Sequence, residues 1–376
     1  MDQTIPNRKK AERGFSLIMI AVCSVVMFGM LGLTTDLGRV YIVKNELQAF
    51  VDASSVAAAL QLNGSQSGLT AADAAAASGP PGPAGTYNGW RFDSLKVPAP
   101  TVSYSTTYGG SYFSSSSGSV DPNSRFVQVQ ATARSPIYFL PIIPGIANSL
   151  AVSAVATAGL SSQNSLPAGG TDGAAPFSPD AHLATSANFG FTKGQLYTLR
   201  MTPPGHGGAT CAGDAGWTDP NPPQDRGYVN FGQGNSNTGI GDVLDNNTTY
   251  GMNVTPKIDI PWVPGQKNVG PFVQTRFNQD TDTNQTETYA QYLSDGTGNG
   301  RRIMIVPVND PVQSSIDGAA YIIGFAAFFL QNDFASYYGN TDALCGEYIG
   351  PATLNSKQPG PTPAGPGTVY IVQLFQ

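Results

Sequence analysis

The feature that most constrains this chain is an uncharged apolar run over residues 15–33. Its nineteen residues, at 1.5 Å each, make a helix of roughly 28 Å, close to the hydrocarbon thickness of a bilayer. Because a single segment satisfies its backbone hydrogen bonds in lipid only as a helix, the run predicts one transmembrane helix. Basic residues stay on the cytoplasmic side, so the leader 1–14 predicts a cytoplasmic N-terminus and an outer body. The basic residues of the leader are Arg8, Lys9, Lys10 and Arg13.

A cleaved secretory signal peptide is the alternative for the same run. The apolar core of a signal peptide usually spans about 7 to 15 residues and ends at a small-x-small cleavage site. The run 15–33 is longer, and it passes into Thr34, Thr35 and Asp36 with no such site nearby. These features favour a retained anchor.

The helix is expected to continue beyond the membrane to residue 62. From Asp36 onward, apolar and small residues recur every three or four positions, as in an amphipathic helix. Asn63 and Gly64 supply a C-terminal stop. The predicted face consists of Leu37, Val40 or Tyr41, Lys44, Leu47, Val51, Ser54 or Ser55, Ala58 and Leu62.

The rest of the chain is rich in turn-forming residues, with 44 Gly and 29 Pro among 376 residues. Alternating polar and apolar residues over 126–133 predict a half-buried strand, whereas the apolar run 321–330 predicts a core strand. The predicted fold class is α+β: a long N-terminal transmembrane and amphipathic helix followed by β-rich, sandwich-like extracytoplasmic modules. The expected segments are a linker 63–85, a β-rich module 86–160, a linker 161–176, and a second β-rich module 177–376 with a closing strand over 368–375.

Three prolines punctuate the apolar segment 136–144, which excludes a helix interior there. The segment either fills the core of the first module or docks on the membrane surface or on the long helix. The sequence leaves these alternatives open.

Charge and motifs exclude several classes of function. The net charge is −6, and a dilute acidic body lacks the basic face that nucleic-acid binding needs. Neither a phosphate-binding loop nor a G-x-S-x-G nucleophile motif is present, and the two histidines, His182 and His206, lie far apart in the sequence. We therefore expect no enzymatic activity and no cofactor.

Two further groups of residues carry specific expectations. Cys211 and Cys345 both lie in the outer body, where an oxidising compartment favours a disulfide, while Cys23 lies in the apolar run. The weak metal candidate is Asp280, Asp282 and Asn284, whose alternating side-chain oxygens suit Ca²⁺. An EF-hand loop would need Gly and Glu where Gln285 and Gln291 stand, so a solvated turn is the alternative reading.

An ordered set of features in residues 13–59 carries a family resemblance. The set comprises Arg13-Gly14, the apolar span, Asp36-Leu37-Gly38-Arg39, Leu47-Gln48, Asp52-Ala53 and Ala57-Ala58-Ala59. In this order they resemble the N-terminal domain of TadG-like proteins of the Tad (Flp pilus) assembly system. Residues 126–158 more loosely resemble the two strands and apolar turn that follow in many TadE- and TadG-like proteins.

The resemblance implies a component of a bacterial pilus assembly or secretion apparatus with a structural role. It implies a single-pass inner-membrane protein with a cytoplasmic N-terminus and a periplasmic or extracellular body. Its partners would be other pilus-assembly membrane proteins or pilin subunits. The residues expected at the membrane and assembly interface are Gly29, Gly32, Asp36, Gly38, Arg39, Gln48 and Asp52.

Two other functions stay open at this point. Gly14-Phe15-Ser16-Leu17 after a basic leader resembles a type IV prepilin processing site, so a pseudopilin cleaved after Gly14 is one alternative. Prepilins carry Glu where Met19 stands here. The other alternative is a tethered glycan-binding or hydrolase domain in residues 177–376, for which paired carboxylates in an aromatic cleft would be the sign.

Overall fold

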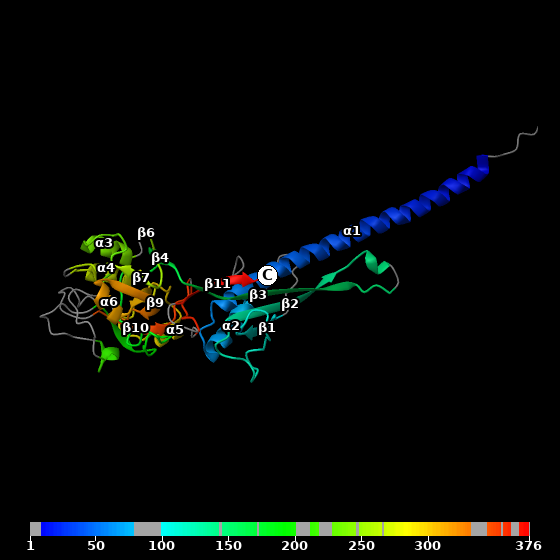
Figure 1. The fold of residues 1–376 in the computed structure, drawn as a ribbon. Coiled ribbons are helices and arrows are strands. Elements are labelled where there is room, and N and C mark those ends of the chain that lie inside the picture. The colour runs from blue at the N-terminus through cyan, green and yellow to red at the C-terminus, as the bar shows by residue number, and fades with distance from the viewer. Residues whose placement is uncertain are drawn as a thin grey trace, which may run out of the picture.

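A computed structural model shows a long helix, a sheet packed against its second half, and a separate β-rich module (Figure 1). The structure describes residues 9–78, 99–142, 145–170, 173–200, 211–217, 228–245, 248–264, 267–331, 344–354, 356–361 and 368–375. The helix α1 runs unbroken from Lys9 to Ala59, 51 residues in all. The predicted fold class, a long apolar helix followed by a β-rich region, is confirmed.

The first module is a two-layer arrangement of helices on one antiparallel sheet. Its strand order is β1-β2-β3-β11. The strands are β1 (Thr101–Ser105), β2 (Phe126–Pro136), β3 (Ser149–Gln163) and β11 (Val369–Phe375). The second half of α1 and the shorter helix α2 (Gln66–Ser78) pack on one face of this sheet.

Small residues on the sheet allow α1 to approach it closely. Every second residue of β2 from Val127 to Ala133 is buried, and Ala154, Ala156 and Ala158 of β3 face the same core. The core-facing side chains of α1 are Val43, Leu47, Phe50, Val51, Ser54, Ser55, Ala58 and Ala59. The predicted helical face is therefore correct from Leu47 onward, but Leu37 and Tyr41 are exposed because the sheet does not cover that side of the helix.

The second module is built on a five-stranded sheet. Four strands follow the order β5-β10-β9-β7, and the fifth strand, β8, also pairs with β9. Its strands are β5 (Leu196–Arg200), β7 (Ile258–Ile260), β8 (Ile303–Asn309), β9 (Ala320–Phe329) and β10 (Leu344–Gly350). A separate ladder joins β4 (Leu166–Gly169) to β6 (Thr249–Val254). The helices of this module are α3 (Asn237–Leu244), α4 (Gly270–Asn278), α5 (Tyr289–Asp295) and α6 (Pro311–Asp317). It also contains a short 3-10 helix, η2 (Ala212–Asp214). A second 3-10 helix, η1 (Leu140–Ile142), lies between β2 and β3 of the first module.

Strand β9 is buried on both faces, which explains its uninterrupted apolar sequence. Ala326 and Phe328 pack into one core, whereas Phe325 and Phe329 pack into the core on the opposite face. Both faces of a strand must be apolar when each lies against a core, so the alternation seen in β2 is absent here.

The strand β11 departs from the predicted segment boundaries. Residues 368–375 were expected to close the second module, but β11 pairs with β3 in the first module's sheet. Val369 belongs to a core of the second module and Tyr370 to the core of the first, so β11 joins the two. The predicted linker 161–176 also contains structure, the strand β4.

Candidate functional site at the junction of the helix and the β2–β3 hairpin

Asp36 of α1 fixes the tip of the hairpin formed by β2 and β3. Its carboxylate accepts three backbone hydrogen bonds, from Tyr138 at 3.0 Å, Phe139 at 2.9 Å and Leu140 at 2.7 Å. The residue is completely buried. We call residues 137–142 and 145–148, between the two strands, the hairpin tip. The apolar, proline-rich segment therefore docks on the long helix, which was one of the two predicted alternatives.

The carboxylate of Asp36 is held in its charged form. Burial opposes ionisation, but the three N–H donors and the positive charge of Arg39 outweigh it, so the pKa of Asp36 lies below its ordinary value of 3.8. Hydrogen bonds to an ionised acceptor are stronger than neutral ones. The junction therefore depends on a charge that is present at neutral pH.

Gly32 allows the hairpin tip to touch the helix one turn before Asp36. A Cβ atom at this position would lie 2.6 Å from Cβ of Phe139, closer than packed atoms approach. The guanidinium of Arg39 lies over the ring of Tyr138, 4.7 Å from its centroid. A glycine contact, a carboxylate and a cation–π contact thus hold the same short segment.

Two polar side chains of α1 bind the stretch of β3 that β11 leaves unpaired. Strand β11 pairs with β3 only over residues 157–163. Before that stretch, Lys44 Nζ donates to the carbonyl of Ser153 at 2.5 Å, and Gln48 Nε2 donates to the carbonyl of Val155 at 3.1 Å. Gln48 also donates to Asp52 at 2.8 Å. The helix therefore satisfies backbone acceptors that a neighbouring strand would otherwise bind.

The seven residues predicted for the assembly interface fall into two groups. Five make contacts within the chain at or near this junction: Gly32, Asp36, Arg39, Gln48 and Asp52. Gly29 and Gly38 face open space, because a Cβ at either position would meet nothing within 4 Å. Sequence reasoning offered docking of the segment that contains Tyr138 and Phe139 on the helix as one alternative, but it did not identify Lys44 as a donor to β3. Contacts of these residues with other proteins stay a prediction.

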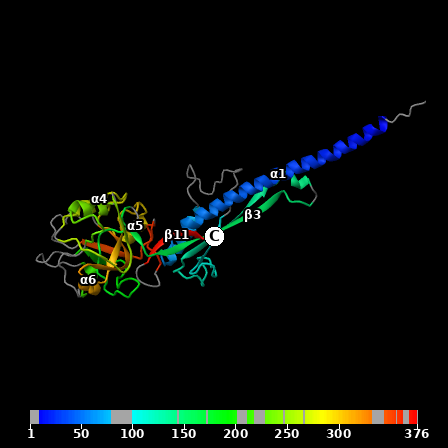
Figure 2. The ribbon, with the colours of Figure 1, turned by 45° about the horizontal axis from the view of Figure 1, so that its top comes forward.

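The first half of α1 projects away from the rest of the protein (Figures 1 and 2). Its apolar side chains are exposed, up to 73 % for Val25. Among the described residues, α1 is the one helix long and apolar enough to cross a bilayer. The exposed apolar surface of this helix suits the hydrocarbon of a bilayer.

In the second module, Cys211 and Cys345 form a disulfide with their Cα atoms 5.8 Å apart. Cys345 lies on β10 and Cys211 directly precedes η2. Next to this bond, Asp214 accepts a hydrogen bond from the backbone N–H of Thr198 at 2.9 Å and contacts His182 Nε2 at 2.9 Å. His182 stacks on Trp217 with ring centroids 4.4 Å apart, so its imidazole ring packs against an aromatic side chain. His206 lies outside the described residues.

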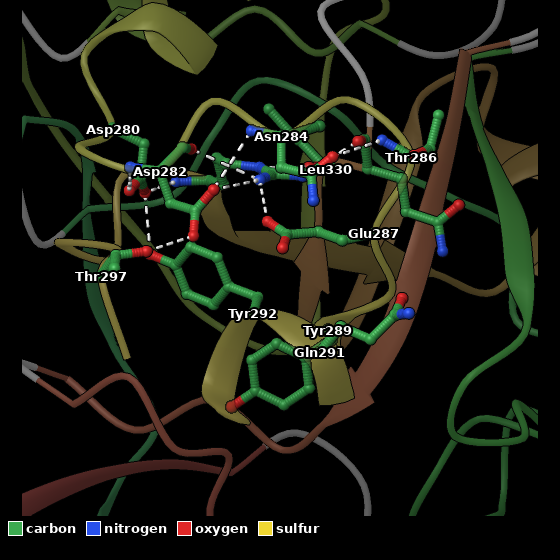
Figure 3. A network of polar contacts seen from close by, with 12 residues as sticks. Asp280, Asp282, Asn284, Thr286, Glu287, Tyr289, Gln291, Tyr292, Thr297 and Leu330 are labelled. Carbon is green, nitrogen blue, oxygen red and sulfur yellow. Dashed lines mark hydrogen bonds and ion pairs between the residues drawn. The ribbon is translucent and has the colours of Figure 1, made fainter. Parts of the chain in front are cut away.

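In the segment considered for Ca²⁺, the acidic side chains of Asp280 and Asp282 lie in a buried network (Figure 3), whereas Asn284 lies in an exposed turn over residues 283–286. Asp280 accepts from the backbone N–H groups of Asp282, Asn299 and Arg302, each at 3.0 Å. It also accepts from the hydroxyl of Tyr292 at 2.8 Å. Four donors therefore already occupy this carboxylate.

Arg302 supplies positive charge to the same network. It is completely buried, contacts Glu287 directly and lies 3.9 Å from Asp282. Its guanidinium also donates to the carbonyl of Leu330 at 2.8 Å and lies 4.4 Å from the ring centroid of Phe329. An internal cation thus faces Asp282, one of the three residues considered for Ca²⁺, together with Glu287.

The two carboxylates beside Arg302 have opposite pKa shifts. The hydroxyl of Thr297 and the backbone N–H of Asn284 lower the pKa of Asp282. Burial raises the pKa of Glu287, although Arg302 opposes this effect. Oxygens of Asp282, Glu287 and exposed Asp295 lie within 4.8 Å of one another. The single positive charge of Arg302 faces Asp282 and Glu287 together, so the oxygens of this group already lie beside a buried cation.

Together these features define a class of protein: β-rich modules joined through a packed, hydrogen-bonded junction to one helix suited to a membrane. Residues 14–61 match the family model Tad, described as putative Flp pilus-assembly TadE/G-like. The N-terminal segment is therefore a TadE/G-like domain, which confirms the resemblance and supports a pilus-related role. No curated protein and no solved structure gives a match to the chain. The matched residues coincide with α1 and its C-terminal turn and do not extend into either sheet.

Proposed function

We propose that this chain is a membrane-anchored structural component of a Tad/Flp-type pilus assembly or secretion apparatus. Its N-terminus lies in the cytoplasm, residues 15–33 cross the inner membrane, and both β-rich modules lie outside. It binds other membrane proteins of the apparatus or pilin subunits, needs no cofactor and catalyses no reaction.

One observation carries this proposal: the family-matched segment is a single helix with two different surroundings. Its first half is exposed and apolar, whereas its second half supplies Leu47, Phe50 and Val51 to the core of the first module. Cleavage after residue 35 would remove Gly32 with its contact to Phe139 and would leave Asp36 at a new chain end. This coupling favours a retained anchor over a removable signal peptide.

Two cavities in the described part of the chain, of about 210 and 290 Å³, bear on the hydrolase alternative. One of about 210 Å³ is lined by basic and polar residues that include Arg276, Arg301 and Lys357. Among its described lining residues there is no Asp, Glu, His or Cys, so it lacks the paired carboxylates of a glycosidase.

Gene deletion with complementation tests the proposal. In the producing bacterium, deletion should abolish or strongly reduce surface pili, and the full chain should restore them. A second complementing chain, with residues 15–33 replaced by an unrelated apolar helix of equal length, tells whether the helix only anchors or also binds partners. Normal piliation in the deletion strain would refute the assembly role.

Topology and processing are measured separately. Alkaline phosphatase is active only outside the cytoplasm, so a fusion after residue 375 should be active and a fusion before residue 9 inactive. Intact-mass measurement should give the full-length chain, allowing for ordinary removal of the initiator Met. Loss of residues 1–14 would support the pseudopilin alternative instead.

A further inference from the structure

We propose that the hairpin tip is a second membrane contact, which inserts into the headgroup boundary of the bilayer that α1 crosses. This inference rests on the proposed function insofar as it takes residues 15–33 to span a membrane. It adds an interaction surface, a lipid surface as its partner, and a fixed orientation of the body.

The position of the tip is set by its contacts with the helix. Phe139 packs on Gly32, one residue before the apolar span ends at position 33. Asp36, the next charged residue, binds the backbone of the same tip. Both ribbon views show the hairpin running beside α1 and ending part-way along it (Figures 1 and 2). If the span fills the hydrocarbon layer, the tip lies at its outer boundary.

The chemistry of the tip suits that boundary. Residues 137–150 contain no charged side chain. Tyr138 is 57 % exposed, Phe139 47 % and Ile146 38 %, and Leu150 at the start of β3 is also exposed. Aromatic side chains, Tyr and Trp above all, concentrate at membrane interfaces, where the ring is apolar and the polar end reaches water.

The exposed apolar surface continues on the helix beside the tip. Leu33, Leu37 and Tyr41 are spaced four residues apart and are all exposed, Leu37 by 51 % and Tyr41 by 67 %. Among the described residues, none buries this stripe, which is continuous with the apolar span. Its first residue, Leu33, lies at the level of the tip, so the same lipid covers both, whereas Tyr41 lies roughly 12 Å further along the helix.

Two contacts have a mechanical consequence that one contact lacks. A helix alone leaves the outer modules free to tilt relative to the membrane plane. A tip bound rigidly to the helix by Asp36 and seated in the same leaflet defines one tilt and one face toward the bilayer. The modules are then presented to neighbouring proteins in one orientation.

The test uses full-length protein in vesicles of phosphatidylethanolamine and phosphatidylglycerol. In a Cys23→Ser background, single cysteines at Ile146, Phe28 and Gln130 are labelled with a polarity-sensitive fluorophore. Quenching is measured with lipids that carry a nitroxide near the headgroup. Phe28 lies in the span, and Gln130 is exposed on β2, roughly 26 Å along the strand from the tip at about 3.3 Å per residue.

We expect strong quenching at positions 146 and 28 and at least a fivefold weaker effect at 130. Quenching at 28 but not at 146 would overturn the tip contact and leave the anchor intact. Quenching at neither position would overturn the anchor itself. Burial of position 146 only when other pilus-assembly proteins are added would show that a protein, not lipid, occupies the surface, and would also overturn the inference.

Discussion

The carboxylate of Asp36 accepts the backbone N–H of Leu140 at 2.7 Å, across 104 positions of sequence. This bond and its two neighbours link the long helix to the sheet of the first module. Their disruption should therefore separate anchoring from the orientation of the body.

Replacement Asp36→Asn should loosen the hairpin tip without unfolding the modules. The amide has one acceptor oxygen and no charge, and hydrogen bonds to a charged group contribute about 1.5–3 kcal/mol each. We expect local destabilisation of about 2–4 kcal/mol, seen as faster hydrogen exchange at residues 138–140. Asp52→Asn is the matched control on the same helix, because its contact with Gln48 survives as a neutral hydrogen bond. Equal exchange in wild type and Asp36→Asn would contradict the role of the carboxylate.

Substitution of two glycines by alanine should have effects of opposite sign. Gly32→Ala places a methyl group 2.6 Å from Phe139 and should cost about 1–3 kcal/mol through overpacking. Gly29→Ala meets nothing within 4 Å and should stabilise the helix by about 0.5–1 kcal/mol. Exchange at residue 139 and the thermal midpoint in detergent report the two effects. Unchanged hydrogen exchange and an unchanged thermal midpoint in Gly32→Ala would show that Phe139 does not pack closely against the helix at this position.

The junction should be stable at neutral pH and open under acid. Because the folded pKa of Asp36 lies below 3.8, its stabilising contribution is present above that value and is lost as the pH falls through the lowered folded pKa. A spin label at Ile146→Cys in the Cys23→Ser background should become mobile only in that acidic range. In Asp36→Asn the label should be mobile at all pH values, and a transition near neutral pH would point to another group.

Loss of Arg302 should destabilise the second module strongly. Arg302→Met leaves Glu287 and Asp282 buried beside an uncharged side chain, and removal of one partner of a buried ion pair costs about 3–5 kcal/mol. For a module of this size the melting temperature should fall by roughly 10 °C. Arg301→Met, one residue earlier and partly exposed, should cost about 1 kcal/mol. Partial recovery in Arg302→Met with Glu287→Gln would show that unpaired charge causes the loss.

Reduction of the Cys211–Cys345 bond should lower the stability of the second module. The bond closes a loop with a sequence separation of 134, for which chain entropy gives up to about 4–5 kcal/mol. A phosphine reductant should therefore lower the denaturation midpoint. Cys23→Ser, which leaves the disulfide intact, should not change it. An unchanged midpoint after verified reduction would show that native packing alone holds these segments.

Local patterns in the sequence predicted the elements well, because periodicity depends on near neighbours. The continuous helix through residue 59 and the apolar strand β9 follow from spacing and run length alone. The partners of Asp36 could not be predicted, because its three donors are backbone groups whose position depends on the hairpin. The pairing of β11 with β3 was missed for the same reason: an edge strand carries no local mark of the sheet that it joins.

The return of β11 to the first sheet sets an order of events during synthesis. The edge of β3 over residues 157–163 has no strand partner until residues 369–375 have been made. A chain that emerges in sequence order therefore holds an open sheet edge while some two hundred further residues emerge and fold. Such an edge readily pairs with a strand of another protein. A chaperone or a neighbouring subunit would therefore bind the edge of β3 most easily before β11 has been made.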